Sequence, residues 1–158
     1  MDNTIYRDGN YCTIRLLTKE KPILNQKPEY KLIPKLFLPE NSERKTEGGL
    51  RMQGYYKKSY KDKPLISVVT VVYNGEKYLD QTIKSVLNQG YDNVEYIVID
   101  GDSRDSTVDI IRKYEEHIDY WVSEPDAGIY DAMNKGASLC SGKYIAFLNA
   151  DDWLIAIR

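Results

Sequence analysis

Carboxylates stand at the ends of two strand-like segments of this chain. Asp151 and Asp152 follow the apolar run 143–148, and Asp100 follows the run 94–99. Two adjacent ionised carboxylates repel each other, so they favour a site where a cation or sugar hydroxyls lie between them. Hard oxygen ligands of this kind suit magnesium or manganese. The pattern predicts a metal-assisted site. The alternatives are a helix cap for the aspartate pair and a turn carboxylate for Asp100.

An aromatic side chain can complete such a site. Tyr73 follows the first apolar run, 65–72. Together with Asp100 it can hold a nucleobase, because an aromatic ring packs on the base and a carboxylate accepts an N–H. Asp151 and Asp152 can then hold ribose hydroxyls and a divalent cation that bridges a diphosphate. Such a cation would neutralise a diphosphate leaving group, which is Lewis-acid catalysis.

The segments that must position these residues alternate between strand and helix patterns. Strands are expected at 65–72, 94–99, 118–122 and 143–148. Between them, apolar residues recur at helical spacing, and Asn74 is expected to cap the first helix. This alternation predicts an α/β fold with a mostly parallel sheet and helices on both faces.

In a sheet of this kind, ligands bind beyond the carboxyl ends of the strands, where the strand order reverses. Right-handed crossovers would bring the ends of the first and fourth strands together. Tyr73, Asp100 and the pair Asp151 and Asp152 are therefore expected to converge on one crevice.

The chain is predicted to divide near Lys63 and Pro64. Residues 1–63 are polar, charged and poorly periodic, so they are expected to form an N-terminal extension. Its last part, 55–63, is basic and rich in tyrosine and is expected to be a solvated linker. Contact with phosphate or acidic lipid is the alternative. Residues 64–158 form the expected α/β domain.

Composition and motifs exclude several classes. The 158 residues carry a net charge of -2, which gives no general attraction to nucleic acid or membranes. The two cysteines are too few for a disulfide framework or zinc site, and His117 is the single histidine, so histidine-based triads have little support. Neither a dinucleotide-binding nor a P-loop glycine motif is present. With no long apolar run and no leader pattern, the simplest compartment is the cytoplasm.

Several segments carry a family resemblance. They are PLISVVTVVYNG at 64–75, SVLNQ at 85–89, IDGDSRDST at 99–107 and NADD at 149–152. Together they resemble the N-terminal half of family-two glycosyltransferases with the Rossmann-like GT-A fold. SEPDAGIYDAMNKG at 123–136 and EGGLR at 47–51 are similar to a bacterial branch of that family. The resemblance covers residues 64–154.

The resemblance implies an inverting transfer of a sugar from a nucleotide diphosphate sugar, with manganese or magnesium as cofactor. Tyr73 and Asp100 would contact the base. Asp151 would contact the ribose or the sugar, and Asp152 would be the principal metal ligand.

The resemblance also places the loop that begins at Asp126 near the diphosphate or donor sugar, with Asp131, Asn134 and Lys135. Those three residues could equally cap and decorate a helix. Asp102 stands where the family more usually has glycine, and 104–106 replace a more common Thr-Asp-Gly.

The family's general base is a carboxylate on a later segment, so it is expected beyond Arg158. The chain is therefore predicted to be a truncated nucleotide-sugar-binding half, with the C-terminal part of the fold missing. An edge left bare on the fourth strand would make it marginally stable and prone to self-association.

The leading hypothesis is a glycosyltransferase that acts on a glycan, polysaccharide or lipid-linked acceptor, either in the cytoplasm or associated peripherally with the inner face of the membrane. The alternative is a truncated, non-catalytic module that binds a nucleotide sugar. A nucleotidyltransferase is disfavoured, because its glycine- and arginine-rich loop after the first strand is missing.

Overall fold

The strands of the described chain form one mostly parallel sheet. A computed structural model describes residues 4–5, 9–26 and 31–155. Within these ranges the strand order is β1-β4-β3-β2-β5. The strands are β1 (Thr46–Gly48), β2 (Ile66–Val72), β3 (Val94–Asp100), β4 (Tyr120–Ser123) and β5 (Tyr144–Phe147). Among the strand pairs of this sheet, β1–β4 is antiparallel and the other three are parallel. The predicted mostly parallel α/β sheet is confirmed.

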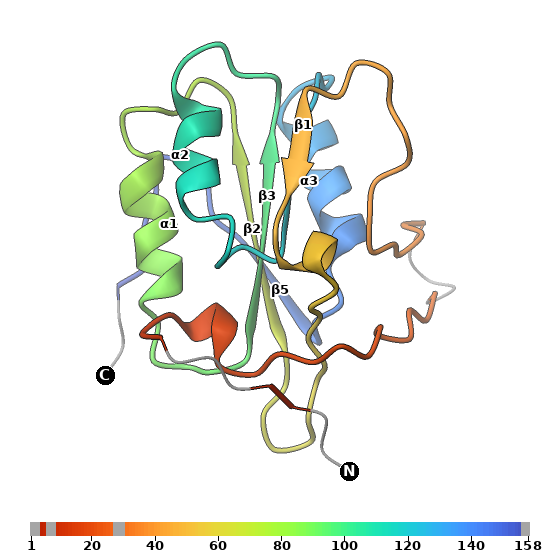
Figure 1. The fold of residues 1–158 in the computed structure, drawn as a ribbon. Helices are drawn as coiled ribbons and strands as arrows, with labels where there is room; N and C mark the ends of the chain where they lie inside the picture. Colours follow the sequence, from red (N-terminus) through yellow and green to blue (C-terminus); the bar gives the residue numbers. More distant parts are fainter. Residues whose placement is uncertain (1–3, 6–8, 27–30, 156–158) are drawn as a thin grey trace.

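Helices cover both faces of this sheet. Helices α1 (Leu79–Leu87) and α2 (Thr107–Lys113) lie on one face, and α3 (Ile129–Leu139) lies on the other (Figure 1). Two short 3-10 helices, η1 (Cys12–Ile14) and η2 (Leu50–Gln53), belong to the segment before β2. No helix among the described residues is long and apolar enough to cross a membrane.

The core explains why local sequence patterns predicted these elements. The residues on the apolar face of α1 are all fully buried; they are Leu79, Ile83, Val86 and Leu87. Strand β3 is buried along its whole length, as expected for a central strand covered on both faces. Helix α3 approaches the sheet closely, since a β-carbon at Gly136 would lie 2.4 Å from Cγ1 of Val69.

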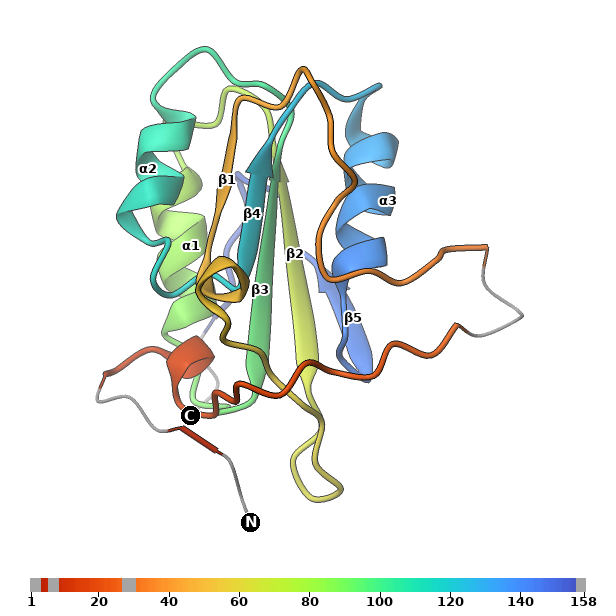
Figure 2. The same ribbon diagram turned by 45° about the vertical axis from the view of Figure 1, so that its right-hand side comes forward.

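Described parts of the segment before residue 64 pack on the sheet. In Figure 2 its described parts pass beneath the lower ends of the strands and climb beside α3 before they enter β1. The backbone N–H groups of Leu50 and Arg51 donate hydrogen bonds to the carbonyl oxygens of Ile118 and Asp119, each at 2.9 Å. The prediction of a solvated linker over 55–63 is wrong at Tyr56 and Lys57, which are 6% and 2% exposed.

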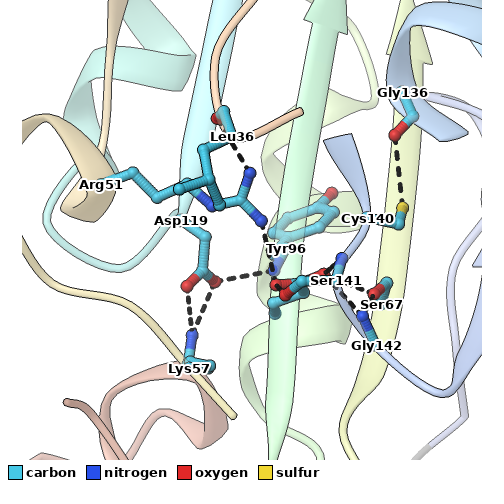
Figure 3. A network of polar contacts seen from close by, with 11 residues as sticks. Leu36, Arg51, Lys57, Ser67, Tyr96, Asp119, Gly136, Cys140, Ser141 and Gly142 are labelled. Carbon is cyan, nitrogen blue, oxygen red and sulfur yellow. Dashed lines mark hydrogen bonds and ion pairs between the residues drawn. The ribbon is translucent and has the colours of Figure 1, made fainter. Parts of the chain in front are cut away.

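Two buried ion pairs explain this burial (Figure 3). Lys57 Nζ lies 2.6 Å from both carboxylate oxygens of Asp119, and Arg51 Nη2 lies 3.0 Å from Glu95 Oε2. Tyr96 N–H donates to Asp119 Oδ2 at 2.8 Å. A buried charge requires a partner of opposite charge. Glu95 and Asp119 can therefore be buried because the N-terminal segment supplies Arg51 and Lys57.

Glu95 is stabilised in its ionised form. Burial raises the pKa of its carboxyl group, but the charge of Arg51 and hydrogen bonds from Ser67 and Ser141 outweigh that effect, so the pKa lies below its ordinary value. Ser67 Oγ and Ser141 N–H both donate to Oε1 at 2.5 Å. The carboxylate therefore joins β2, β3 and the loop before β5 to the N-terminal segment.

Replacing Lys57 by methionine is expected to lower the free energy of unfolding by about 3–5 kcal/mol, because Asp119 would be left buried and uncompensated. Urea denaturation followed by circular dichroism measures this change. Lys58→Met is the control, since Lys58 lies 3.9 Å from Glu20 with 36% of its side chain exposed, and a change below about 1 kcal/mol is expected for it. Equal destabilisation by both variants would contradict a structural role for the buried pair.

Candidate functional site

A pocket of about 470 Å³ lies at the carboxyl ends of β2, β3 and β4, beside the start of α3. This is the edge of a parallel sheet at which ligands bind. Its lining comes from the ends of three strands, their following loops and the first turn of α3: Val71, Val72, Tyr73, Gly101, Asp102, Arg104, Pro125, Asp126, Gly128, Ile129 and Ala132. The lining is mostly apolar and includes three charged residues, Asp102, Arg104 and Asp126.

Tyr73 lies in this pocket, immediately after β2. Its side chain is 65% exposed, which is unusual for a large aromatic residue beside a buried strand. An exposed ring at a pocket wall can stack on a flat ligand. The structure thus places Tyr73 where a base could pack, and the contact itself stays a prediction.

Asp100 does not line the pocket but directly precedes the lining residues Gly101 and Asp102. The residue is fully buried, and its oxygens accept hydrogen bonds from Ser103 and Ser123. Oδ2 accepts from Ser103 N–H at 3.0 Å and Ser123 Oγ at 2.6 Å, and Oδ1 accepts from Ser103 Oγ at 2.5 Å. The carboxylate therefore fixes the turn that presents Gly101 and Asp102 to the pocket. Direct contact between Asp100 and a base stays a prediction.

The loops after β2 and β3 are tied together by side chains. Asn74 N–H donates to Ser103 Oγ at 2.7 Å, and Arg104 N–H donates to Asn74 Oδ1 at 2.9 Å. Asn74 adopts a left-handed φ of 48°, so it does not cap α1, which begins only at Leu79. The capping prediction is wrong because the amide is used between loops instead.

A second tie involves Asp105. Although burial raises its pKa, hydrogen bonds from Thr107 and from the backbone N–H of Glu76 lower it below its ordinary value. The Glu76 N–H donates to Asp105 Oδ2 at 3.1 Å, and the Glu76 carboxylate in turn accepts from Ser106 N–H at 3.0 Å. This reciprocal arrangement holds the two loops in one geometry.

Asp131 and Lys135 shape the loop between β4 and α3. Asp131 Oδ2 accepts from Ala127 N–H at 3.0 Å. Lys135 Nζ donates to the carbonyl oxygen of Pro125 at 3.0 Å and lies 3.1 Å from Glu124 Oε1. Neither side chain lines the pocket. Contact of Asp131 or Lys135 with a ligand stays a prediction.

Asp126 is the acid of this loop that does line the pocket. Its Oδ1 accepts from Gly128 N–H at 2.9 Å. A β-carbon at Gly101 would lie 2.6 Å from Asp126 Oδ2. The absence of a side chain at position 101 thus lets the loop after β4 close over the loop after β3.

Asp151 and Asp152 follow β5, and both are exposed. Thr82 Oγ1 on α1 lies 2.9 Å from the carbonyl oxygen of Ala150 and 2.7 Å from that of Asp152, so its single O–H anchors this stretch of backbone. Ala150 Cβ lies 3.5 Å from the place of a β-carbon at Gly75, so the loops after β5 and β2 are neighbours. The expected convergence is confirmed for the loops, although neither aspartate lines the pocket.

The donor chemistry of this pair fits a hard divalent cation. Both carboxylates are exposed, and in the described part of the chain neither makes a side-chain hydrogen bond or an ion pair. No group of three or more potential ligands occurs among the described residues. Oxygens of a diphosphate and water molecules would therefore have to complete the coordination.

Two basic residues near the site were missed in the sequence. Lys45 Nζ lies 3.2 Å from Asp102 Oδ1 and donates to the carbonyl oxygen of Ser103 at 2.8 Å. Arg44 Nε lies 2.8 Å from Glu124 Oε2. Both stand just before β1, in a segment without periodicity, where nothing local indicates which loop they will reach.

Comparison with known proteins identifies the family. A sequence profile described as "Glycosyl transferase family 2" matches residues 67–155, more than half of the chain. The chain belongs to this family. The matched stretch contains β2 from its second residue, all of β3 to β5 and every loop of the pocket, whereas β1, Arg44 and Lys45 lie before it.

Two relatives of this family 2 chain come from bacteria. An uncharacterized glycosyltransferase of Mycobacterium tuberculosis is 44% identical over 90 residues, which is 56% of this chain and 34% of the relative. A Bacillus subtilis protein named as a putative glycosyltransferase of teichuronic acid biosynthesis is 41% identical over 93 residues, 57% of this chain and 37% of the relative. The chain spans about a third of the length of these relatives.

Solved structures agree on the fold. The crystal structure of S. aureus TarS 1-349 in complex with UDP-GlcNAc matches with a TM-score of 0.51 and 25% identity, over 56% of this chain and 27% of TarS 1-349. A mannosyltransferase from Pyrobaculum calidifontis in complex with GDP-Man and Mn2+ matches with a TM-score of 0.53 and 22% identity, over 60% of this chain and 29% of that one. The GT-A fold expected from the sequence is confirmed.

Proposed function

We propose that this chain is the donor-binding half of a family 2 glycosyltransferase. The reaction is an inverting, metal-dependent transfer of a sugar from a nucleotide diphosphate sugar to a glycan or polysaccharide precursor. The observation that carries this proposal is that every residue lining the pocket lies within the stretch that matches the family. The UDP-GlcNAc complex of TarS supports a nucleotide sugar as the ligand.

We propose one role for each residue of the site. Tyr73 packs on the base, and Asp100 holds the loop on which the base rests and accepts an N–H from it. Asp151 binds ribose or the donor sugar. Asp131 and Lys135 keep the loop before α3 in place beside the diphosphate, through the contacts with Ala127 and Pro125.

Asp152 is the proposed principal metal ligand. Its exposed carboxylate and anchored backbone suit an ion that arrives together with the nucleotide. A bound manganese or magnesium ion would supply charge neutralisation for the diphosphate leaving group. The Pyrobaculum mannosyltransferase was solved with both GDP-Man and Mn2+, which agrees with this chemistry.

The second candidate is a module that binds a nucleotide sugar and transfers nothing. The pocket supports the binding step, which both candidates share. Transfer requires a base positioned against the acceptor hydroxyl, and we place that base beyond Arg158. For the complete reaction we propose a cytoplasmic location, with lipid-linked acceptors met at the inner face of the membrane.

Metal dependence gives the direct test of the donor site. UDP or GDP is expected to bind far more tightly with Mn2+ than with a chelator, and Asp152→Asn is expected to remove most of that difference. Isothermal titration calorimetry measures both. Asp62→Asn, in the segment before β2, is the control and should leave the metal effect unchanged. An unchanged metal effect in Asp152→Asn would remove Asp152 as the ligand.

Asp100→Ala and Asp105→Ala are expected to differ in their effect on nucleotide binding, although both remove hydrogen bonds that hold loops of the site. Asp100→Ala should weaken nucleotide binding by about 1–3 kcal/mol, the scale of losing a charged hydrogen-bond partner. Asp105→Ala removes the contacts with Thr107 and Glu76, so it should affect the melting temperature more than affinity. Calorimetry paired with thermal unfolding checks this. Equal effects of the two variants on affinity would contradict the distinction.

The exposed face of β5 predicts association of the isolated chain. Tyr144, Ile145 and Phe147 are 55%, 46% and 46% exposed, and β5 is an edge strand. Bare edges and apolar patches promote association. We expect concentration-dependent oligomers in sedimentation velocity, reduced by Ile145→Lys, and little or no sugar transfer. A monodisperse monomer with robust turnover would refute both expectations.

A further inference from the structure

Asp102 occupies a backbone conformation that suits glycine better. Its φ is 66°, in the left-handed region, where a side chain is uncommon and glycine meets no steric penalty. Aspartate is tolerated there mainly when its side chain makes a local hydrogen bond. In this turn the Ser103 N–H donates to Asp100 instead. The turn itself therefore gives no reason for a carboxylate at position 102.

Stability gives no strong reason either. The ion partner of Asp102 is Lys45, with Nζ 3.2 Å from Oδ1, and the two side chains are 46% and 36% exposed in the order Lys45, Asp102. Exposed pairs of this kind contribute little to folding, because water screens them. A strained backbone that is not offset by a strong contact points to a role in the pocket.

The pocket is where this carboxylate is presented. Asp102 lines it together with Tyr73 and Arg104. Lys45 is its ion-pair partner, with Nζ 3.2 Å from Oδ1, and within the described chain the Asp102 side chain has no further ion-pair partner. An ionised carboxylate repels a diphosphate, so its suitable ligand group is a neutral N–H or O–H of the nucleoside.

Lys45 is itself held in place. Its backbone N–H donates to the carbonyl oxygen of Ser123 at 2.9 Å, and its Nζ donates to the carbonyl oxygen of Ser103 at 2.8 Å. The preceding Arg44 is tied to Glu124. The N-terminal segment thus brings a fixed ammonium group to the wall of a pocket that the matched family region builds.

We propose that Asp102 determines which nucleoside the pocket accepts, through a hydrogen bond from a base N–H or a ribose hydroxyl to its carboxylate, and that Lys45 is the residue that positions it. This inference rests on the proposed function. It adds a specificity element that is formed jointly by the N-terminal segment and the pocket. A site built around an acceptor discriminates strongly against a ligand that lacks the matching donor.

The test compares Asp102→Gly, Asp102→Asn and the unchanged chain by calorimetry with UDP and GDP in the presence of Mn2+. Asp102→Gly is expected to weaken the tighter nucleotide about tenfold. Its melting temperature should stay the same or rise, because glycine relieves the backbone strain. Asp102→Asn keeps the shape without the charge, and an intermediate loss is expected.

Ligand analogues identify the group that Asp102 binds. The 2′-deoxy, 3′-deoxy and ring N-methyl forms of the tighter nucleotide each lack one donor. The unchanged chain should bind one of them more weakly than the parent, and Asp102→Gly should bind that analogue and the parent equally. A base contact and a ribose contact are thus distinguished, and a purely structural role would leave the discrimination intact.

Lys45→Met tests the positioning role. It is expected to reduce the same discrimination in part, by about threefold, the scale of a weak exposed ion pair. Lys63→Met is the matched control: Lys63 and Asp92 are 41% and 37% exposed, close to the values for Lys45 and Asp102, and neither lines the pocket. The control should bind all ligands as the unchanged chain does.

The outcomes separate this inference from the proposed function. If the unchanged chain binds neither UDP nor GDP, the proposed function and the role of Asp102 are both wrong. If it binds them and Asp102→Gly binds parent and analogues in the same way as the unchanged chain, only the role of Asp102 falls. A fall in melting temperature of about 5 °C or more in Asp102→Gly, with affinity lost for every ligand alike, would show a structural residue and also overturn the inference.

Discussion

The parallel pairing of β2 with β3 on one side and β5 on the other is the constraint on which the site depends. Val72 at the end of β2 is in register with Asp100, and Val69 is in register with Phe147. Because all three strands run in the same direction, their following loops leave the sheet at one edge. The loops that carry Tyr73, Asp100 and Asp152 lie at the same edge of the sheet for this reason.

The N-terminal segment takes part in the same arrangement through charge. Glu95 and Asp119 lie inside the sheet region, and each has a basic partner from residues before β2. Such pairs are weak sources of net stability, but they are specific, because either acid without its base would be an uncompensated buried charge. The docking of the segment is thereby fixed, and so is the approach of Arg44 and Lys45 to the loops of the pocket.

The loops of the site combine strain with tight hydrogen bonding. Asn74 and Asp102 are the described non-glycine residues with left-handed φ, and both belong to loops beside the pocket. The left-handed φ of Asn74 is explained by the hydrogen bond that its side chain accepts from Arg104 N–H, because this bond joins the two loops. Asp102 has no comparable structural reason, and this difference between two residues in the same backbone region is the physical basis for assigning a ligand role to one of them.

The sequence by itself determined the secondary structure of residues 65–148, the parallel sheet, and the chemical types at the strand ends. This was possible because a strand buried on both faces and a helix with one apolar face, such as α1, have distinct local periods. The same pattern brought Tyr73 to the pocket edge and placed the loop of Asp151 beside the loop after β2.

Only the tertiary structure decided how those groups point and what surrounds them. Asp100 turns inward because serines from two separate segments donate to it. Lys57 is buried because it pairs with Asp119, a residue that lies 62 positions later in the sequence, beyond α2. Asp102 has a left-handed φ, and its ion-pair partner Lys45 comes from a segment without periodicity. These contacts join residues that no local pattern relates, so they arise only when the chain is packed.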